Sequence, residues 1–307
     1  MFISQILCKA QEAANKIEES KTIANKDIIS LDIASVVVYS LSLIAIAFGL
    51  IQILRKPKGQ RLQFAKMREN QINILIAAGI FLVVFQLSGF IFATTIKILK
   101  PNIVSKSDHY LYSALVRLFA NIPSILAMLF LSKLLFKKGL AGIGFPKLVD
   151  YPKDIAKGIY YFIAAYLPVS IGMMFVALVL MVINNLTGSN YGMGVHSTIT
   201  QLKQMPLGPQ IILLFAIGVL VPIFEELIFR GYIQTSFRNY LGPVASIALA
   251  SIPFTAMHAN ITHFPALFIL SSFMGYSYEK TGKILVPITI HVCFNSSVII
   301  MGIIQTT

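Results

Sequence analysis

Three charged side chains, Glu225, Glu226 and Arg230, follow directly on the apolar run IILLFAIGVLVPI. Charges near the centre of a bilayer cost roughly 2.5 to 3.5 kcal/mol each, so partners or water must compensate for them. On a helix, Glu226 and Arg230 are four positions apart and share a face, which suits an ion pair. Glu225 is turned about 100° away from Glu226, so this pairing leaves it out. A carboxylate in such a place can accept and return a proton, as a general base does.

Two further polar pairs with the same spacing lie in later apolar segments. GPVASIALASIPFTAMHAN carries Phe254 and His258, and ILVPITIHVCFNSSVII carries His291 and Asn295. Residues four apart project from one helix face. A lone histidine at the end of such a segment is more often structural or interfacial than catalytic. The three pairs together predict a polar site inside an apolar bundle.

The depth of the first two pairs can be estimated from the turn between their segments. If the chain turns near Gly242, Glu225 and His258 both lie about sixteen residues, or ~24 Å, along adjacent antiparallel helices. They are therefore expected to meet at one level. The same argument does not fix the level of His291.

A proline lies close to each of these polar pairs. A proline inside a helix leaves the carbonyl four residues earlier without its donor and kinks the axis, which can open a wet pocket within a membrane. Membrane helices also tolerate proline without such a role, so both interpretations stand. The three prolines are Pro222, Pro253 and Pro287.

The elements that must position these side chains are membrane-spanning helices. Of the 307 residues, 56% are hydrophobic and only 12% are charged. Repeated apolar runs long enough to cross a bilayer predict an all-α fold, a polytopic integral membrane bundle of about eight transmembrane helices. The expected spans are about 31–54, 71–98, 110–136, 158–184, 209–238, 243–260, 264–279 and 284–304.

The net charge of +13 does not indicate nucleic-acid binding, because the basic residues cluster in loops that flank the apolar spans. There they act as topology determinants and contact anionic lipid. Only two cysteines are present, Cys8 and Cys293, with no spacing typical of a disulfide framework. The abundance of Ile, Lys and Asn favours a bacterial source, and hence a multi-pass protein of a bacterial cell membrane.

The segments FEELIFRG, PFTAMH and HVCFN resemble the three signatures EExxxR, FxxxH and HxxxN of the CAAX protease and bacteriocin-processing family. This family is also called Abi or type II CAAX prenyl endopeptidases. The motifs occur in the family's order, each within an expected span. The resemblance covers about residues 155–307 and implies an intramembrane protease core there. Residues 1–29 are then expected to form an N-terminal arm and residues 30–154 accessory transmembrane helices.

The resemblance also implies roles for the motif residues. Glu225 corresponds to the catalytic carboxylate and His258 to its partner in activating water, while His291 and Asn295 would polarise the scissile carbonyl. The implied activity is hydrolysis of a peptide bond in a peptide, a lipidated protein or a membrane protein. The residues expected to support the site are Glu226, Arg230 and Phe254.

A metal-dependent mechanism is an open alternative. Glu225, His258 and His291 form a two-histidine, one-carboxylate set of the type that binds Zn²⁺ with an open position for water. The sequence lacks HExxH, so three separate helices would supply the ligands. The Asn295 amide fits an oxyanion role better than a ligand role, which favours the metal-free mechanism.

Two other classes of function use similar residues. Intramembrane Glu and His also mark the pathways of proton-coupled transporters, although no internal repeat is visible here. A non-catalytic peptide-binding or bacteriocin-immunity protein could hold a partner in the same cavity. Loss of product formation in Glu225→Ala and His258→Ala, with partner binding retained, separates an enzyme from a scaffold.

Overall fold

The computed structural model describes residues 37, 39–52, 54–55, 74–98, 106–145, 147–192, 205–258 and 260–304. Within these residues every regular element is a helix. Four helical segments are long and apolar enough to cross a membrane, at 75–98, 110–135, 139–187 and 207–238, and shorter apolar helices lie at 39–52, 243–256 and 285–301. The predicted all-α membrane bundle is confirmed. The expected N-terminal arm, residues 1–29, lies outside the described residues.

The helices coincide closely with the spans expected from hydropathy. Proline stands in the first turn of α4, α9 and α10, where its missing N–H costs nothing. Left-handed glycines, Gly188 at φ 68° and Gly282 at φ 63°, end α4 and α10. The bounds of these helices are α2 Ile74–Ile98, α3 Lys106–Leu135, α4 Tyr151–Thr187, α9 Pro243–Ala256, α10 Phe264–Thr281 and α11 Leu285–Ile304.

The span predicted at 209–238 is one helical column with changing geometry. Two π-helices interrupt its α-helical parts, and π-helical turns inside helices often mark functional sites. Glu226 is the last residue of α7, directly before the second π-helix. The column consists of α6 Leu207–Phe215, π-helix η4 Ala216–Leu220, α7 Val221–Glu226, π-helix η5 Leu227–Gln234 and α8 Thr235–Arg238.

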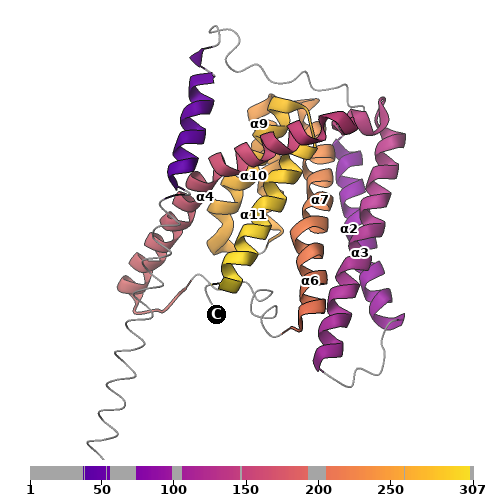
Figure 1. The fold of residues 1–307 in the computed structure, drawn as a ribbon, viewed down its shortest axis with the longest axis horizontal. Coiled ribbons are helices and arrows are strands. Elements are labelled where there is room, and N and C mark those ends of the chain that lie inside the picture. Colours follow the sequence, from indigo (N-terminus) through magenta and orange to yellow (C-terminus); the bar gives the residue numbers. More distant parts are fainter. Residues whose placement is uncertain are drawn as a thin grey trace, which may run out of the picture.

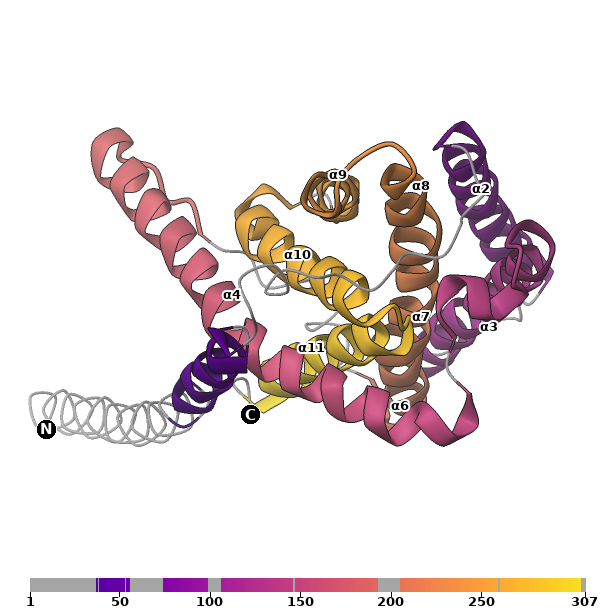
Figure 2. The ribbon, with the colours of Figure 1, turned by 90° about the horizontal axis from the view of Figure 1, so that it is seen from above.

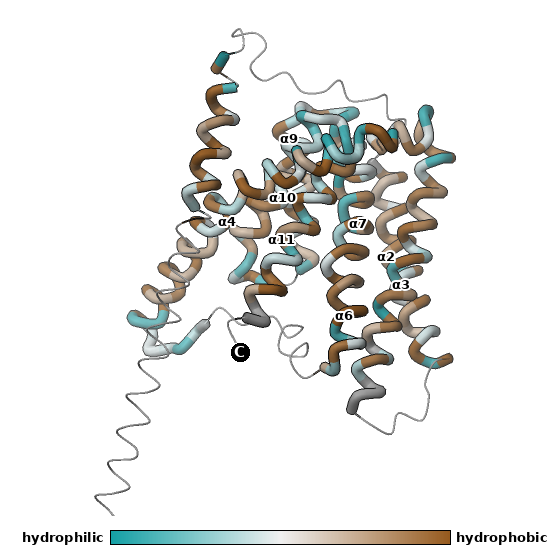
Figure 3. The backbone as a smooth tube through the Cα atoms, in the orientation of Figure 1, coloured by the Kyte–Doolittle hydropathy of each residue, from teal (hydrophilic) through white to brown (hydrophobic). Residues whose placement is uncertain are grey.

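The column stands in the middle of the bundle. Figures 1 and 2 show α9, α10 and α11 between this column and the long helix α4, while α2 and α3 flank the column on its other side. The principal packing contacts agree, because α4 packs on α10 and α11, and α3 packs on α2 and α6. Figure 3 shows teal, hydrophilic residues interrupting the mostly brown column. Polar side chains are thus held between apolar helices.

A serine from the helix at 39–52 hydrogen-bonds the backbone of α4 next to a proline. Pro168 lies inside α4 and has no N–H, so the carbonyl of Ala164, four residues earlier, lacks its helical donor. The Ser42 hydroxyl donates to that carbonyl at 3.2 Å and accepts from the Leu167 N–H at 3.1 Å. Ser42 is fully buried there. It therefore repairs the backbone hydrogen bonding at the proline.

We expect Ser42→Ala to destabilise the protein by ~1 to 3 kcal/mol, because the buried carbonyl of Ala164 loses its donor. In a Pro168→Ala background the residue at 168 regains an N–H, so the same substitution should cost clearly less. The free energy of unfolding in mixed detergent micelles measures both effects. An equal cost of Ser42→Ala in the two backgrounds would contradict this account of the serine.

Candidate functional site

A fully buried ion pair forms the base of the site. Arg230 Nη1 donates to Glu226 Oε1 at 2.8 Å, and the two side chains are 1% and 0% exposed. Their spacing of four residues places them on one helix face, as predicted from the sequence. Arg230 Nη2 also donates to the Ser271 carbonyl at 3.0 Å and to the Ser271 hydroxyl at 2.8 Å. The guanidinium therefore bridges the column and α10.

The imidazole of His291 joins the two adjacent carboxylates. Its Nδ1 lies 2.9 Å from Glu226 Oε1, and its Nε2 lies 3.6 Å from Glu225 Oε2. His291 is 2% exposed, whereas the Glu225 side chain is 22% exposed. The level of His291, which spacing alone left open, is therefore the level of the two glutamates.

The buried carboxylate of Glu226 is paired with donors on two sides. Buried charges are tolerated when they are paired with opposite charges at hydrogen-bond distance. Glu226 Oε1 accepts from both Arg230 and His291 Nδ1, and Glu225 Oε2 lies beside the second nitrogen of His291. His291 thus lies between the two carboxylates.

The ring of Phe254 on α9 forms a wall beside the cluster. The Arg230 guanidinium carbon lies 4.8 Å from the ring centroid, a cation–π distance. The His291 and His258 rings lie 5.6 Å and 5.0 Å from the same ring, centroid to centroid. Phe254 is 1% exposed. It therefore contacts both imidazoles and the guanidinium.

His258 lies just beyond the end of α9 and is exposed. Its Nδ1 is 2.9 Å from the Phe254 carbonyl, so Nδ1–H donates there and leaves Nε2 as an acceptor. Within the described residues no hydrogen bond joins His258 to Glu225. Phe254 contacts Phe229 at 5.2 Å, and stepping four residues along each antiparallel helix leads to Glu225 and His258. The helix register thus agrees with the level predicted from the sequence.

Asn295 contacts the column where a π-helix meets a proline. The Asn295 Nδ2 donates to the Ile217 carbonyl at 3.2 Å. In π-helical geometry a carbonyl pairs with the N–H five residues later, and for Ile217 that residue is Pro222, which has none. The sequence predicted a free carbonyl four residues before Pro222. The π-helical turn shifts the free carbonyl by one residue, to Ile217. The second amide hydrogen of Asn295 is left for another acceptor.

The candidate metal set is not assembled. In the part of the chain that the structure describes, no group of three or more His, Cys, Asp or Glu side chains could hold a metal ion. Glu225 and His291 approach each other at 3.6 Å, whereas His258 is hydrogen-bonded to the Phe254 carbonyl and contacts the Phe254 ring. The arrangement does not fit a three-ligand Zn²⁺ site.

Ser271 is the site neighbour that sequence reasoning missed. It lies in SSFMGYSYEK on α10, outside every motif, and its side chain is fully buried. A polar residue in an apolar helix is the only sequence signal, and it does not single out Ser271 from Ser277 on the same helix. The parallel packing of α10 on the column decides which serine meets Arg230.

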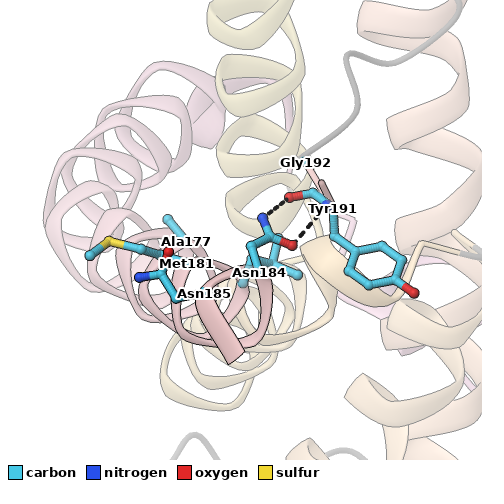
Figure 4. Close-up of a pocket in the computed structure, with 7 residues that line it drawn as sticks. Ala177, Met181, Asn184, Asn185, Tyr191 and Gly192 are labelled. Carbon is cyan, nitrogen blue, oxygen red and sulfur yellow. Dashed lines mark hydrogen bonds between the residues drawn. The ribbon is translucent and has the colours of Figure 1, made fainter. Parts of the chain in front are cut away.

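A separate shallow pocket of about 330 Å³ lies at the C-terminal end of α4. Figure 4 shows the Asn184 amide hydrogen-bonded to the Tyr191 backbone there, with both bonds at 2.8 Å. None of its lining residues belongs to the Glu–His–Arg cluster. This pocket therefore adds nothing to the candidate site.

Fold and site together define a polytopic helical membrane protein with a buried cluster of carboxylates, an imidazole and a guanidinium. Residues 207–297 match the family model of Rce1-like proteins, described as type II CAAX prenyl endopeptidases. The match contains all three motifs and confirms the resemblance to the CAAX protease family over this segment. It supports a CAAX-type intramembrane protease. No curated protein and no solved structure matches the chain.

Proposed function

We propose that the chain is an intramembrane endopeptidase that hydrolyses a peptide bond with a water activated by Glu225 and His258. One observation carries the proposal. Among the described residues, Glu225 Oε2 is one of five buried side-chain oxygens with no hydrogen-bond partner, and it lies 3.6 Å from His291 Nε2. A buried unsatisfied carboxylate oxygen is costly, so it indicates a place for a donor such as the attacking water.

The proton steps follow from the donors and acceptors at the site. Glu225 accepts a proton from the water as the water oxygen attacks the scissile carbonyl carbon. His258 Nε2, which the bond from Nδ1–H to the Phe254 carbonyl leaves as an acceptor, is the second acceptor for that water in this proposal. Glu225 then gives the proton to the leaving amine as the carbon–nitrogen bond breaks. All charges are thereby restored, and no covalent intermediate is required.

The developing oxyanion is stabilised by His291 and Asn295 in this proposal. His291 Nε2 lies 3.6 Å from Glu225 Oε2, and a proton on this nitrogen makes it the donor to the oxyanion, while Nδ1–H remains bonded to Glu226 Oε1. Asn295 keeps one amide hydrogen beyond its bond to Ile217. Each such donor contributes ~3 kcal/mol to transition-state stabilisation.

The proposed substrate class is supported by the match of residues 207–297 to the CAAX endopeptidase model and by the apolar setting of the site. We propose that residues 155–307 form the protease core, with residues 30–154 as accessory transmembrane helices, in a bacterial cell membrane. The substrate is then a peptide or a lipidated or membrane protein that reaches the site from the lipid phase. The apolar helices around the cluster favour such a substrate over a soluble one.

Histidine substitutions test the proposal. The purified protein in detergent or liposomes is incubated with a prenylated CAAX peptide and a library of apolar peptides, and the products are identified by mass spectrometry. His258→Ala and His291→Ala are expected to lower cleavage ~10²- to 10⁴-fold, because the proton acceptor or the oxyanion donor is lost. His263→Ala is the matched control, since His263 Nδ1 pairs with the neighbouring Thr262 hydroxyl at 3.1 Å and belongs to none of the three motifs, and it should cleave like wild type.

Other results would favour a different class of protein. If the wild type binds library peptides but cleaves none, and the histidine variants bind equally well, the chain is a binding protein. Proton-coupled uptake into liposomes that is lost in His291→Ala, without proteolysis, would instead indicate a transporter.

A further inference from the structure

Three polar contacts join the column to α10 at regular intervals. Arg230 donates to Ser271, Gln234 Nε2 donates to the Gly275 carbonyl at 3.1 Å, and Arg238 Nε donates to Glu279 Oε2 at 3.0 Å. Each contact joins residues 41 apart in sequence, and successive contacts are four residues apart on both helices. The two helices therefore run parallel in one fixed register, which we call the polar ladder.

The end of the polar ladder farthest from Glu226 fixes this register. Glu279 is fully buried and accepts from Arg238 and, at 3.1 Å, from Gln234 Nε2. Arg238 also donates to the Leu241 carbonyl, which ties it to the turn before α9. A slip of one turn along the helix would separate Arg230 from the Ser271 hydroxyl and Arg238 from Glu279. Buried polar networks of this kind specify one arrangement strongly.

A glycine lies in the middle of the polar ladder, where helices approach closely. A Cβ at Gly275 would lie 2.9 Å from Gln234 Oε1 and 3.1 Å from Ile247 on α9. The absence of a side chain therefore leaves room for α10 beside both the column and α9. Four residues earlier on α10, the Ser271 carbonyl and hydroxyl both accept from Arg230 Nη2.

The other end of the polar ladder continues into the candidate catalytic cluster. Arg230 holds Glu226 through Oε1, and the same oxygen accepts from His291 Nδ1. Because one oxygen serves both donors, a shift of the guanidinium moves the acceptor of the imidazole. The Ser271 hydroxyl is one of two acceptors that locate Nη2. Its loss leaves the Ser271 carbonyl as the one acceptor of Nη2 among those described, so the guanidinium is located less firmly.

We propose that Ser271 is a positioning residue that acts through Arg230 and Glu226 to hold the His291 imidazole against Glu225. This inference rests on the proposed peptidase function for its effect on rate, but its effect on the imidazole is independent of any activity. Ser271 itself touches no reacting atom in this account.

Ser271→Ala is compared with Ser277→Ala in the full-length protein. Both serines are fully buried on α10, but the Ser277 hydroxyl donates to Met274 in its own helix. Ser271→Ala is expected to lower kcat ~10- to 100-fold with KM within about twofold of wild type, because a small displacement of catalytic groups has effects of this size. Ser277→Ala should leave both constants within about twofold. Equal kinetics of the two variants would overturn the proposal.

Imidazole ¹⁵N NMR provides a readout that needs no turnover. The His291 resonances, assigned by their loss in His291→Gln, are expected to shift in Ser271→Ala and to stay unchanged in Ser277→Ala. Ser271→Cys, which has nearly the size of serine but a weak acceptor, replaces the alanine variant if that variant does not fold. Unshifted His291 resonances overturn the proposal even if the wild type cleaves nothing. Shifted resonances without cleavage would count against the peptidase function alone.

Discussion

Replacing Glu225 by glutamine is expected to lower the rate of peptide cleavage by ~10²- to 10⁴-fold, because an amide cannot accept the proton of the attacking water. The side chain is 22% exposed, and its Oε2 has no hydrogen-bond partner among the described residues, so glutamine keeps the shape and breaks no bond at that oxygen. The free energy of unfolding should change little. Initial rates on a fluorogenic peptide in detergent, compared with thermal unfolding of the same samples, measure both quantities.

Asp150→Asn is the control for Glu225→Gln. The Asp150 carboxylate is 40% exposed and pairs with Lys283 at 3.4 Å, outside the cluster. Its neutralisation should leave the cleavage rate within about twofold of wild type, because a single exposed ion pair contributes little. A Glu225→Gln protein that cleaves at the wild-type rate would exclude Glu225 as the base. A chelator-resistant wild-type activity that is lost in Glu225→Gln would favour the metal-free mechanism.

The helices of this fold were accessible from the sequence because membrane helices carry long apolar runs. Every expected span that the structure describes has a helical counterpart at nearly the same bounds. The pairing of Glu226 with Arg230 was also accessible, since the i, i+4 rule depends on local geometry alone. Local patterns thus predicted both the elements and the first contact of the site.

The features that sequence did not predict depend on contacts between helices. No pattern of residue types distinguishes the π-helices η4 and η5 from an α-helix. The sequence therefore predicted a free carbonyl four residues before Pro222, whereas the carbonyl that accepts from Asn295 is that of Ile217, five residues before it. The level of His291 depends on how α11 packs against the column, which no local spacing records. Ser271 lies next to Arg230 because α10 packs parallel to the column in the register of the polar ladder, which the sequence does not reveal.

Arg230→Met is expected to destabilise the protein by ~3 to 5 kcal/mol, because it leaves the Glu226 carboxylate buried beside only His291. Methionine has a similar length and fills the space against Phe254, so the loss comes from the unpaired charge more than from a cavity. The double variant Glu226→Gln/Arg230→Met removes both charges and should recover most of that stability. Denaturant titration in mixed micelles gives the free energies of unfolding for a double-mutant cycle.

The same cycle separates stability from function at this pair. In the double variant His291 Nδ1 faces an amide instead of a carboxylate, so its charged acceptor is gone and cleavage should stay at least ~10²-fold below wild type. Lys283→Met, at the half-exposed pair with Asp150, is expected to cost under ~1 kcal/mol and to keep activity. Additive single and double effects would mean that Glu226 and Arg230 are not coupled. Full activity in the double variant would mean that their charges serve only the fold.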